Sequence, residues 1–199
     1  SAHPLDEYRI VLDNLCNTHC PDLGDKIELA KLEEVTVGGI VTGVRNGFTK
    51  KGNPFGIVTI EDFEGSGELA LFDADWMNWN GWFKEGASLF IQAKCSKKFP
   101  TSTWIDFRIN SIQLLDKVKE KEIKKITIRI EPEQIDDTVA DNISTMIKGS
   151  PGSTEVYFQV PDLAHHQTVV LRSRTHGVTV HKDLVSYIEQ NPGLSYKIN

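Results

Sequence analysis

Residues 45–55 bring positive charge and aromatic rings together in a short stretch of chain. Arg45, Lys50 and Lys51 lie in or beside a polar turn, and Phe48 and Phe55 stand on either side of it. Cationic side chains neutralise phosphates, and a phenyl ring stacks on a nucleobase. The segment therefore predicts a surface for single-stranded nucleic acid, with the three cations on phosphates and one of the two rings on a base. The alternative is an ordinary hairpin tip that its lysines keep solvated.

A second basic and aromatic cluster follows near residue 100. On the expected strand after it, alternation places Phe107 with the inward apolar residues and Trp104 with the outward ones, so Trp104 is kept as a candidate. Two such clusters strengthen the nucleic-acid hypothesis, because in a small β-barrel the two loops flank one binding face. The full candidate set is Arg45, Phe48, Lys50, Lys51, Phe55, Lys94, Lys97, Lys98, Phe99 and Trp104.

Cys16, His19 and Cys20 have the identities of metal ligands. A structural zinc site needs four ligands, usually in two closely spaced pairs, and no second pair follows in the sequence. We therefore expect ordinary thiols at a helix end and no metal ion. The remaining histidines after residue 160 are scattered at expected turns without an acidic residue at ligand spacing, which favours surface positions.

The sequence contains no motif for catalysis. It lacks a Gly-rich phosphate loop ending in Lys-Ser/Thr, a Gly-x-Ser-x-Gly elbow and a His-Glu-x-x-His helix. The acidic pairs Glu61-Asp62 and Asp136-Asp137 are the only candidates for acid–base or metal chemistry. Asp62 ends a strand, where a carboxylate caps turn amides, and the second pair begins a helix, where negative charge is favoured. We expect no enzyme activity from this chain.

Composition bounds the class of protein. The 199 residues are 39% hydrophobic and 25% charged, which is typical of a globular chain of one large or two small domains. The net charge of −6 argues against a protein that is basic throughout, but it permits a local basic patch. Three cysteines without a regular framework indicate a reducing compartment, and no apolar run approaches the roughly 20 residues of a membrane span. We expect a cytoplasmic location.

Alternating apolar residues predict five strands in the first part of the chain, at residues 35–48, 54–62, 67–72, 88–98 and 103–115. Between the third and the fourth, Trp76, Trp79 and Phe83 have helical spacing. Three strands, a helix and two strands are the order of an OB fold, a five-stranded barrel capped by one helix. Leu5 to Leu15 have helical spacing as well, so residues 1–34 are expected to form a helical lead-in and connector.

A different pattern begins after residue 116. The charged residues 117–125 predict a solvated linker or strand extension, residues 126–130, 155–160, 168–174 and 194–198 alternate as strands, and residues 133–148 and 182–190 have helical spacing. This is a β-α-β-β-α-β order, for which we expect the split βαβ arrangement. The predicted fold class is mixed: an all-β OB-fold barrel at 35–116, the linker, and a small α+β domain at 126–199.

Short segments along the whole chain match the pattern of a known family. They are Ser1-Ala2-His3-Pro4-Leu5, Thr49-Lys50-Lys51-Gly52-Asn53, residues 56–62 and 67–72, and then residues 126–130, 134–137, 184–188 and 195–197. Together they resemble the C-terminal region of the bacterial replicative DNA polymerase III alpha subunit, an OB domain followed by a tau-binding domain. The OB segments alone are also similar to anticodon-binding domains of some tRNA synthetases. Pro54-Phe55 depart from the family pattern, where the stretch is more basic.

The resemblance implies a function for each domain. The OB domain would bind single-stranded template DNA, and the terminal domain would bind the tau subunit of the clamp loader during chromosomal replication. The full-length protein would be a DNA-directed DNA polymerase, a nucleotidyltransferase. Its active site with Mg²⁺ and its sliding-clamp segment would lie upstream, so this fragment would be non-catalytic and without a cofactor. Two alternatives stay open: an RNA-binding module of the anticodon type, and a structural spacer.

Overall fold

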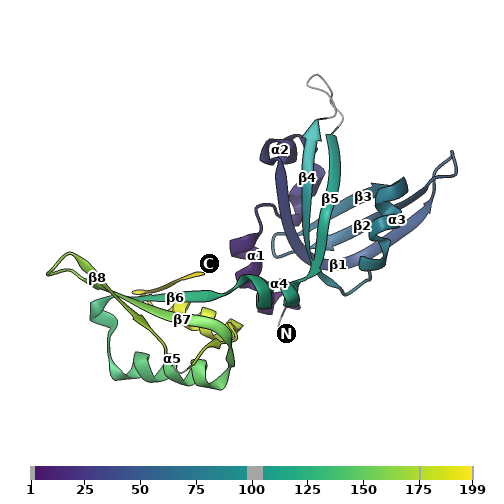
Figure 1. Ribbon diagram of the computed structural model, residues 1–199. Coiled ribbons are helices and arrows are strands. Elements are labelled where there is room, and N and C mark those ends of the chain that lie inside the picture. The colour runs from purple at the N-terminus through teal and green to yellow at the C-terminus, as the bar shows by residue number, and fades with distance from the viewer. Residues whose placement is uncertain (1–2, 98–104, 175, 199) are drawn as a thin grey trace. The chain divides into compact units, whose positions relative to one another are not determined.

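The computed structural model describes residues 3–97, 105–174 and 176–198. The chain divides into two compact units, Ser1–Lys117 and Val118–Asn199 (Figure 1). The boundary in the sequence falls inside helix α4 (Leu115–Glu122). Among the described residues, no helix is long and apolar enough to cross a membrane.

The first unit opens with short helices: η1 (Asp6–Tyr8), α1 (Arg9–Leu15), η2 (Cys20–Gly24) and α2 (Lys26–Leu32), where η denotes a 3₁₀ helix. Leu5 and Leu12 are buried, as their helical spacing predicted. The expected connector before the first strand contains helix α2. Its N-terminus is capped by Asp25, whose carboxylate accepts hydrogen bonds from the backbone N–H groups of Ile27 and Glu28 at 3.2 and 3.1 Å.

Five antiparallel strands form the sheet of the first unit: β1 (Glu34–Phe48), β2 (Pro54–Glu61), β3 (Ser66–Phe72), β4 (Ser88–Lys97) and β5 (Ile105–Leu114). Their spatial order is β3-β2-β1-β4-β5. Helix α3 (Asp73–Trp79) and the turn η3 (Asn80–Trp82) connect β3 to β4. The chain thus forms three strands, a helix and two strands, and β1 pairs with both β2 and β4. This is the topology of an OB fold, so the expected fold is confirmed.

Strand β1 is long because it pairs with β4 along its first half and with β2 along its second half. Residues 34–40 pair with β4, residues 40–48 pair with β2, and the register shifts between Val41 and Gly43. Val35 and Val37 point into the core before the shift, and Val44 does so after it. A shift of this kind bends a strand and changes its twist. The second half of β1 and the hairpin that follows it therefore take a new direction.

Helix α3 packs directly against β2. Trp76 is 7% exposed, Phe83 is 4% exposed, and their rings stack with centroids 6.4 Å apart. The predicted helical spacing holds only in part, because α3 ends at Trp79 and Phe83 follows the turn η3. The approach is close because β2 has a glycine at this point. A Cβ atom on Gly56 would lie 2.3 Å from the indole of Trp76, so a larger residue would displace the helix.

Helix α4 stands where a solvated linker or strand extension was predicted at 117–125, and that prediction is wrong. Leu115 and Val118 are fully buried, and Ile123 just beyond the helix is 1% exposed. Leu115 and Val118 are three residues apart and so share one face of the helix. Many lysines and glutamates around these few apolar residues hid the helical period in the sequence.

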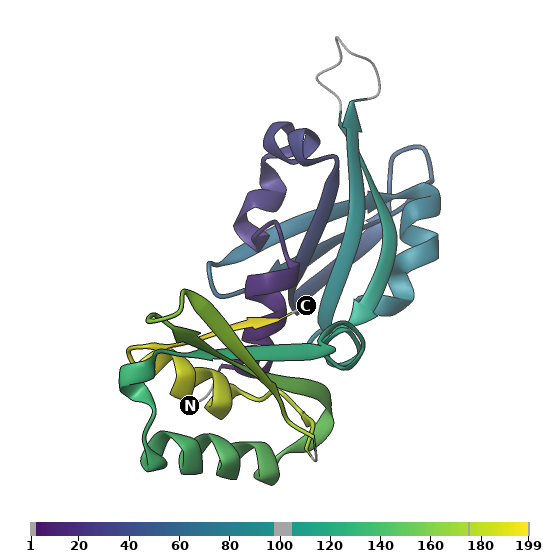
Figure 2. The ribbon, with the colours of Figure 1, turned by 60° about the vertical axis from the view of Figure 1, so that its left-hand side comes forward.

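The second unit is an α+β domain with a four-stranded sheet. Its elements are β6 (Lys125–Ile130), η4 (Pro132–Gln134), α5 (Asp137–Gly149), β7 (Pro151–Asp162), β8 (Gln167–Arg172), α6 (Lys182–Gln190) and β9 (Leu194–Ile198). The predicted β-α-β-β-α-β order is confirmed. Figure 2 shows α5 and α6 on the same face of this sheet.

The strand order β8-β7-β6-β9 differs from the expected split arrangement. In a split βαβ unit another strand lies between the two parallel strands. Here β6 and β7 pair directly in parallel, with Thr127 opposite Tyr157, and β9 pairs with the other edge of β6. The sequence specifies which segments are strands, but the pattern of apolar residues is compatible with either position of β9.

Helix α5 begins later than residue 133, where the sequence predicted its start. Asp136 caps it, accepting a hydrogen bond from the backbone N–H of Val139 at 2.7 Å, and residues 132–134 form a separate 3₁₀ turn. Ile143 and Ile147 are buried as expected, whereas Ile135 is 56% exposed because it precedes the helix. An apolar residue is thereby left at the surface beside the start of α5.

Candidate nucleic-acid interface

The hairpin between β1 and β2 presents the two central lysines of the basic turn. Thr49 N–H donates to the Asn53 carbonyl and Gly52 N–H donates to the Thr49 carbonyl, both at 2.8 Å. Gly52 has a φ of +82°, a left-handed conformation that glycine adopts without strain. The closed turn places Lys50 and Lys51 at its tip, with both side chains exposed.

A pair of aromatic rings lies at the base of this hairpin, on the side of β1, β2 and β3 that faces away from the core. Residues directly opposite each other on neighbouring strands share a face, and the register aligns Gly47, Phe55 and Phe72. The ring centroids of Phe55 and Phe72 are 6.2 Å apart. The adjacent row on the same side is Arg45, Ile57 and Ala70. These six residues are called the outer face below.

Gly47 gives the ring of Phe55 its position on the outer face. A Cβ atom at residue 47 would stand 3.3 Å from the nearest ring carbon, so the ring lies over the bare backbone of β1. Phe55 is half-buried in this place, and Phe72 beside it is 51% exposed. Flat aromatic surfaces of this kind are where bases of a single strand stack.

Arg45 holds the only charge on the outer face itself, and it is paired. Its guanidinium Nη2 donates to Glu68 Oε1 on β3 at 2.5 Å, with both side chains more than half exposed. An exposed ion pair of this kind is worth about 0–1 kcal/mol. The Glu68 carboxylate orients Arg45 next to the rings. The ion pair is weak enough for a phosphate to replace the carboxylate as the partner of Arg45.

Phe48 does not join this ring pair. It lies opposite Pro54, one position out of step with Gly47 and Phe55, so its side chain leaves the sheet on the other side. The ring is 75% exposed. Of the two rings that the sequence offered for stacking, the structure therefore brings Phe55 together with Arg45 and separates Phe48 from both.

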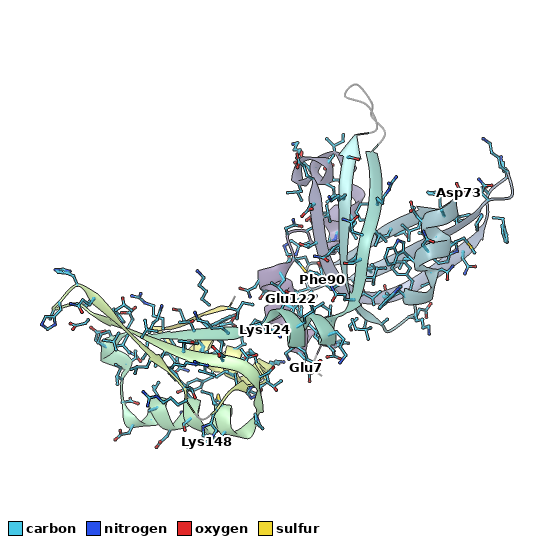
Figure 3. All side chains as sticks on the ribbon, in the orientation of Figure 1. Glu7, Asp73, Phe90, Glu122, Lys124 and Lys148 are labelled. Atoms are coloured by element: carbon cyan, nitrogen blue, oxygen red, sulfur yellow. The ribbon has the colours of Figure 1, made fainter. Side chains whose placement is uncertain are left out.

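Asp73 lies at the same end of the sheet, near the hairpin tip (Figure 3). It follows Phe72 directly and has a φ of +51°, a conformation that is uncommon outside glycine but tolerated by aspartate. Its carboxylate is exposed and offsets part of the positive charge of the hairpin. Neither Phe72 nor Asp73 was among the predicted site residues.

The second predicted cluster is only partly within the described residues. Lys94 extends from β4 and pairs with Glu34, the Nζ and Oε1 atoms being 3.7 Å apart. It thus lies at the start of β1, whereas Arg45 lies near its end. Lys97 is the last residue of β4, and the side chain of Lys97 and all of Lys98, Phe99 and Trp104 lie outside the described residues. Convergence of the two clusters stays a prediction.

Phe107 packs against the core, as alternation predicted when it was dropped from the candidate set. Asp62 is a structural residue, as its position after a strand suggested. Its carboxylate accepts hydrogen bonds from the backbone N–H groups of Cys20, Glu64 and Gly65 at 2.7, 2.9 and 3.1 Å. Asp62 therefore stabilises the turn after β2 and connects it by a hydrogen bond to η2, the segment before α2.

The cysteines near residue 20 are held as neutral thiols. Burial raises the pKa of Cys16 to about 12 and raises that of Cys20 further, and the nearby Asp62 carboxylate adds to both effects. A thiol must lose its proton to bind a metal ion. No group of three or more metal-binding side chains occurs within the described part of the chain.

Comparison with known proteins addresses both units. Residues 126–199 match the family model for the DNA polymerase III alpha subunit, C-terminal domain. The chain is 24% identical over 164 residues to the DNA polymerase III subunit alpha of Haemophilus influenzae, which aligns 81% of this chain with 14% of the relative. It is 30% identical over 135 residues to that of Halalkalibacterium halodurans, with 67% of this chain and 12% of the relative aligned.

The resemblance to the DNA polymerase III alpha subunit is confirmed. The second unit has only 82 residues (199 − 117), so an alignment of 164 residues also extends through much of the OB unit. Both units therefore share the similarity to DNA polymerase III alpha subunits. The chain spans only about an eighth of the length of these relatives, 14% and 12%.

A crystal structure of the mitochondrial single-stranded DNA binding protein Rim1 of S. cerevisiae aligns with 42% of this chain and 93% of its own. The identity is 14% and the TM-score is 0.31. A similarity of this size carries no argument, and the OB assignment rests on the strand order of the first unit.

Phe72 was available to sequence reasoning in part. Leu69 and Leu71 alternate as inward residues of β3, which places Ala70 and Phe72 on the outer face. What the sequence does not contain is the register between β2 and β3 that sets Phe72 beside Phe55. Only the pairing of the two strands turns two separate phenylalanines into one stacking surface.

Proposed function

We propose that the first unit binds single-stranded DNA on its outer face, as part of a DNA polymerase III alpha subunit. The observation that carries this proposal is the Phe55–Phe72 ring pair at the base of a hairpin with two exposed lysines at its tip. The relatives are named as subunits of a DNA polymerase, an enzyme class whose template is single-stranded where it is copied.

Binding on this face would combine two interactions. Bases stack on Phe55 and Phe72, each stack contributing about 1–3 kcal/mol. Phosphates of the same strand contact Arg45, Lys50 and Lys51, which releases counterions and makes the affinity depend on salt. The remaining positions of the outer face are Ile57, Ala70 and Gly47, which have no side-chain hydrogen-bond donor to read a base edge. The site therefore accepts any sequence.

The acidic residues around the face limit its strength. Glu68 competes with phosphate for Arg45, Asp73 stands close to the hairpin, and the whole chain has a net charge of −6. The site would guide a template strand that other parts of a longer polymerase subunit hold, and it would not coat DNA. Catalysis, with Mg²⁺, and the contact with the sliding clamp belong in this proposal to those other parts.

For the second unit we propose that it binds the tau subunit of the clamp loader in the cytoplasmic replisome. Its match to the C-terminal domain of the alpha subunit supports this role. The open face of its sheet carries side chains that interact with each other: Arg172 pairs with Glu155, and the Lys125 ammonium lies 4.6 Å from the ring centre of Tyr157. Arg129 on the same face likewise pairs with Glu131, and two cations paired with carboxylates weaken the attraction of this face for DNA.

The test is the binding of fluorescently labelled oligo-dT to the 199-residue chain at several salt concentrations, with tRNA as competitor. We expect salt-dependent binding that unstructured DNA competes for better than tRNA. A strong preference for tRNA would favour the anticodon-type module. If neither oligo-dT nor tRNA binds at low salt, the remaining alternative is that the chain is a structural spacer. Capture of purified tau by the same chain tests the second unit.

A further inference from the structure

We propose that the free edge of β8 is a docking strand for an extended peptide whose side chains enter the groove between β8 and α5. The inference rests on the proposed protein-binding function of the second unit and specifies how a partner segment would be held. The partner is defined by its chemistry: alternating apolar residues, with acidic residues at one end.

Strand β8 is an exposed edge. It pairs with β7 on one side, and among the described residues no strand pairs with its other side. All six of its residues, Gln-Thr-Val-Val-Leu-Arg, are exposed, and the sequence has strong β-propensity, no proline and one charge. Natural proteins usually block such an edge with charges, proline or a covering loop. An edge that is about 20 Å long and left open offers backbone hydrogen bonds to an incoming strand.

The opposite edge of the same sheet shows the usual protection. Strand β9 is shorter than β8 and reads Leu-Ser-Tyr-Lys-Ile, with Leu194 buried and Lys197 exposed. A lysine in an edge strand discourages pairing with another chain. The two edges of one sheet therefore differ: the lysine of β9 lies within the strand, whereas the one charge of β8, Arg172, is its last residue and pairs with Glu155 of β7.

A groove runs beneath β8 on the helix side of the sheet. Its walls are Phe158 and Val160 of β7, Leu171 of β8, and Ile143 and Ile147 of α5, and its volume is 380 Å³. The register sets Leu171 opposite Phe158 and Val169 opposite Val160, so both β8 side chains face the helices. They remain 54% and 47% exposed because the helices do not cover this edge. Alternate side chains of an added strand would extend this apolar row into the groove.

One end of the groove is cationic. Lys148 of α5 (Figure 3) and His176 line it there, and the exposed Arg174 directly follows Ser173, which also lines the groove. The other end is formed by Ile130 and Ile135. Because opposite charges at the rim orient a bound segment, the peptide is expected to place acidic residues beside Lys148.

A second copy of the chain fits this edge less well. In an antiparallel pair of β8 strands, the cationic end of one strand would meet the start of the other. That start offers Gln167 and Thr168, and the acid beside it, Asp162, lies on β7 opposite Gln167 and is already paired with His165. An exchange of two six-residue edges is also small against the roughly 1,200 Å² that stable interfaces bury. Self-association is therefore an outcome of the test and not the proposal.

The experiment compares Leu171→Lys with Val170→Lys in the 199-residue chain. The two side chains are adjacent, equally exposed at 54%, and on opposite sides of β8, so charge and location are matched while only Leu171 lines the groove. The probes are purified tau and a synthetic peptide, Ac-Glu-Glu-Val-Thr-Val-Thr-Val-Thr-NH₂, together with its reversed sequence. Circular dichroism verifies that both variants fold.

We expect Leu171→Lys to weaken binding of tau and of one peptide orientation by about tenfold or more, and Val170→Lys by less than about threefold. Hydrogen exchange should show new protection of the β8 amides that do not bond to β7. If tau binds but β8 gains no protection and both variants behave alike, the docking mode is overturned while the tau function stands. If only the peptide binds and protects β8, the edge stands and tau is the wrong partner.

Two further outcomes overturn the proposal. One is the failure of both probes to bind the folded chain. The other is a concentration-dependent dimer that protects β8 without any probe and is abolished by Leu171→Lys, which would assign this edge to a second copy of the chain.

Discussion

The outer face of the first unit and the β8 edge of the second both expose apolar residues on a sheet, yet they suit different ligands. On the outer face the apolar groups are aromatic rings on two paired strands, β2 and β3, with cations at the border of the face. At β8 they are aliphatic side chains beside an unpaired strand edge and a groove. Rings offer flat surfaces to bases, whereas an open edge offers hydrogen bonds to a peptide backbone.

The comparison teaches that exposed hydrophobicity alone does not define a site. Phe48 is the most exposed of the large apolar side chains on the hairpin, at 75%, but neither Phe55 nor Phe72 accompanies it on its side of the sheet. What distinguishes the outer face is that three strands bring two rings and an arginine into register. What distinguishes β8 is that its edge, which pairs with no other strand among the described residues, borders an apolar groove.

The largest expected effect comes from removing both rings. Phe55→Ala with Phe72→Ala should weaken binding of oligo-dT by about 1–3 kcal/mol for each ring, because each loses one stacked base, with little change in the salt slope. Fluorescence anisotropy at fixed salt measures the change. Binding of tau should be unaffected, which separates the two surfaces.

Phe48→Ala is the matched control for the ring pair. It removes the same side chain from the same hairpin, and from a more exposed position, but on the other side of the sheet. We expect little loss of affinity. A loss equal to that of the double variant would mean that bases stack on the hairpin tip and that the outer face is not the site.

The next effect concerns the phosphate contacts. For single strands the slope of log K against log salt is about −0.7 per neutralised phosphate, so loss of three contacts flattens it by about 2 units. We expect this when Arg45, Lys50 and Lys51 are replaced together by serine. Lys148→Ser, on the second unit, should leave the slope as it is. If the triple variant keeps both affinity and slope, the basic turn is only a solvated hairpin tip.

A third prediction separates the two units by stability. Gly56→Ala places a methyl group against the buried Trp76 and should destabilise the first unit by about 1–3 kcal/mol through overpacking. Gly81→Ala is the control, because a Cβ atom there meets no atom within 4 Å. Hydrogen exchange of β1–β5 should accelerate while that of β6–β9 is unchanged. Equal acceleration in both would show that the units unfold together.

The strands were the most predictable part of the fold. Period-two alternation located β1 to β5 within one or two residues where both are described, because each strand buries one side only. Helix α4 was missed, because Leu115 and Val118 are separated by charged residues and give too short an apolar stripe. The place of β9 was also missed, because a strand's sequence does not record which neighbour it pairs with.

The candidate site was predictable to the extent that it is local. Lys50, Lys51 and Gly52 form a turn whose chemistry is contained in consecutive residues. The partnership of Phe55 with Phe72, and of Arg45 with Glu68, depends on the register of three strands, which neighbouring residues do not determine. For the same reason the exposed edge of β8 could not be seen in its sequence, since its exposure depends on the order of the strands.

The smallest effect tests whether electrostatics at the border of the outer face opposes DNA. Asp73 stands directly after Phe72, near the hairpin lysines, and its exposed carboxylate repels a phosphate on the adjacent ring pair. Asparagine tolerates the φ of +51° as well as aspartate does, so Asp73→Asn removes the charge without disturbing the turn. We expect affinity for oligo-dT to rise by about two- to threefold at low salt, and the gain to vanish at high salt through screening. Asp75→Asn removes the same charge two residues further along and controls for net charge. A gain of equal size from both would show that only the overall charge matters, and the outer face would then have no electrostatic border of its own.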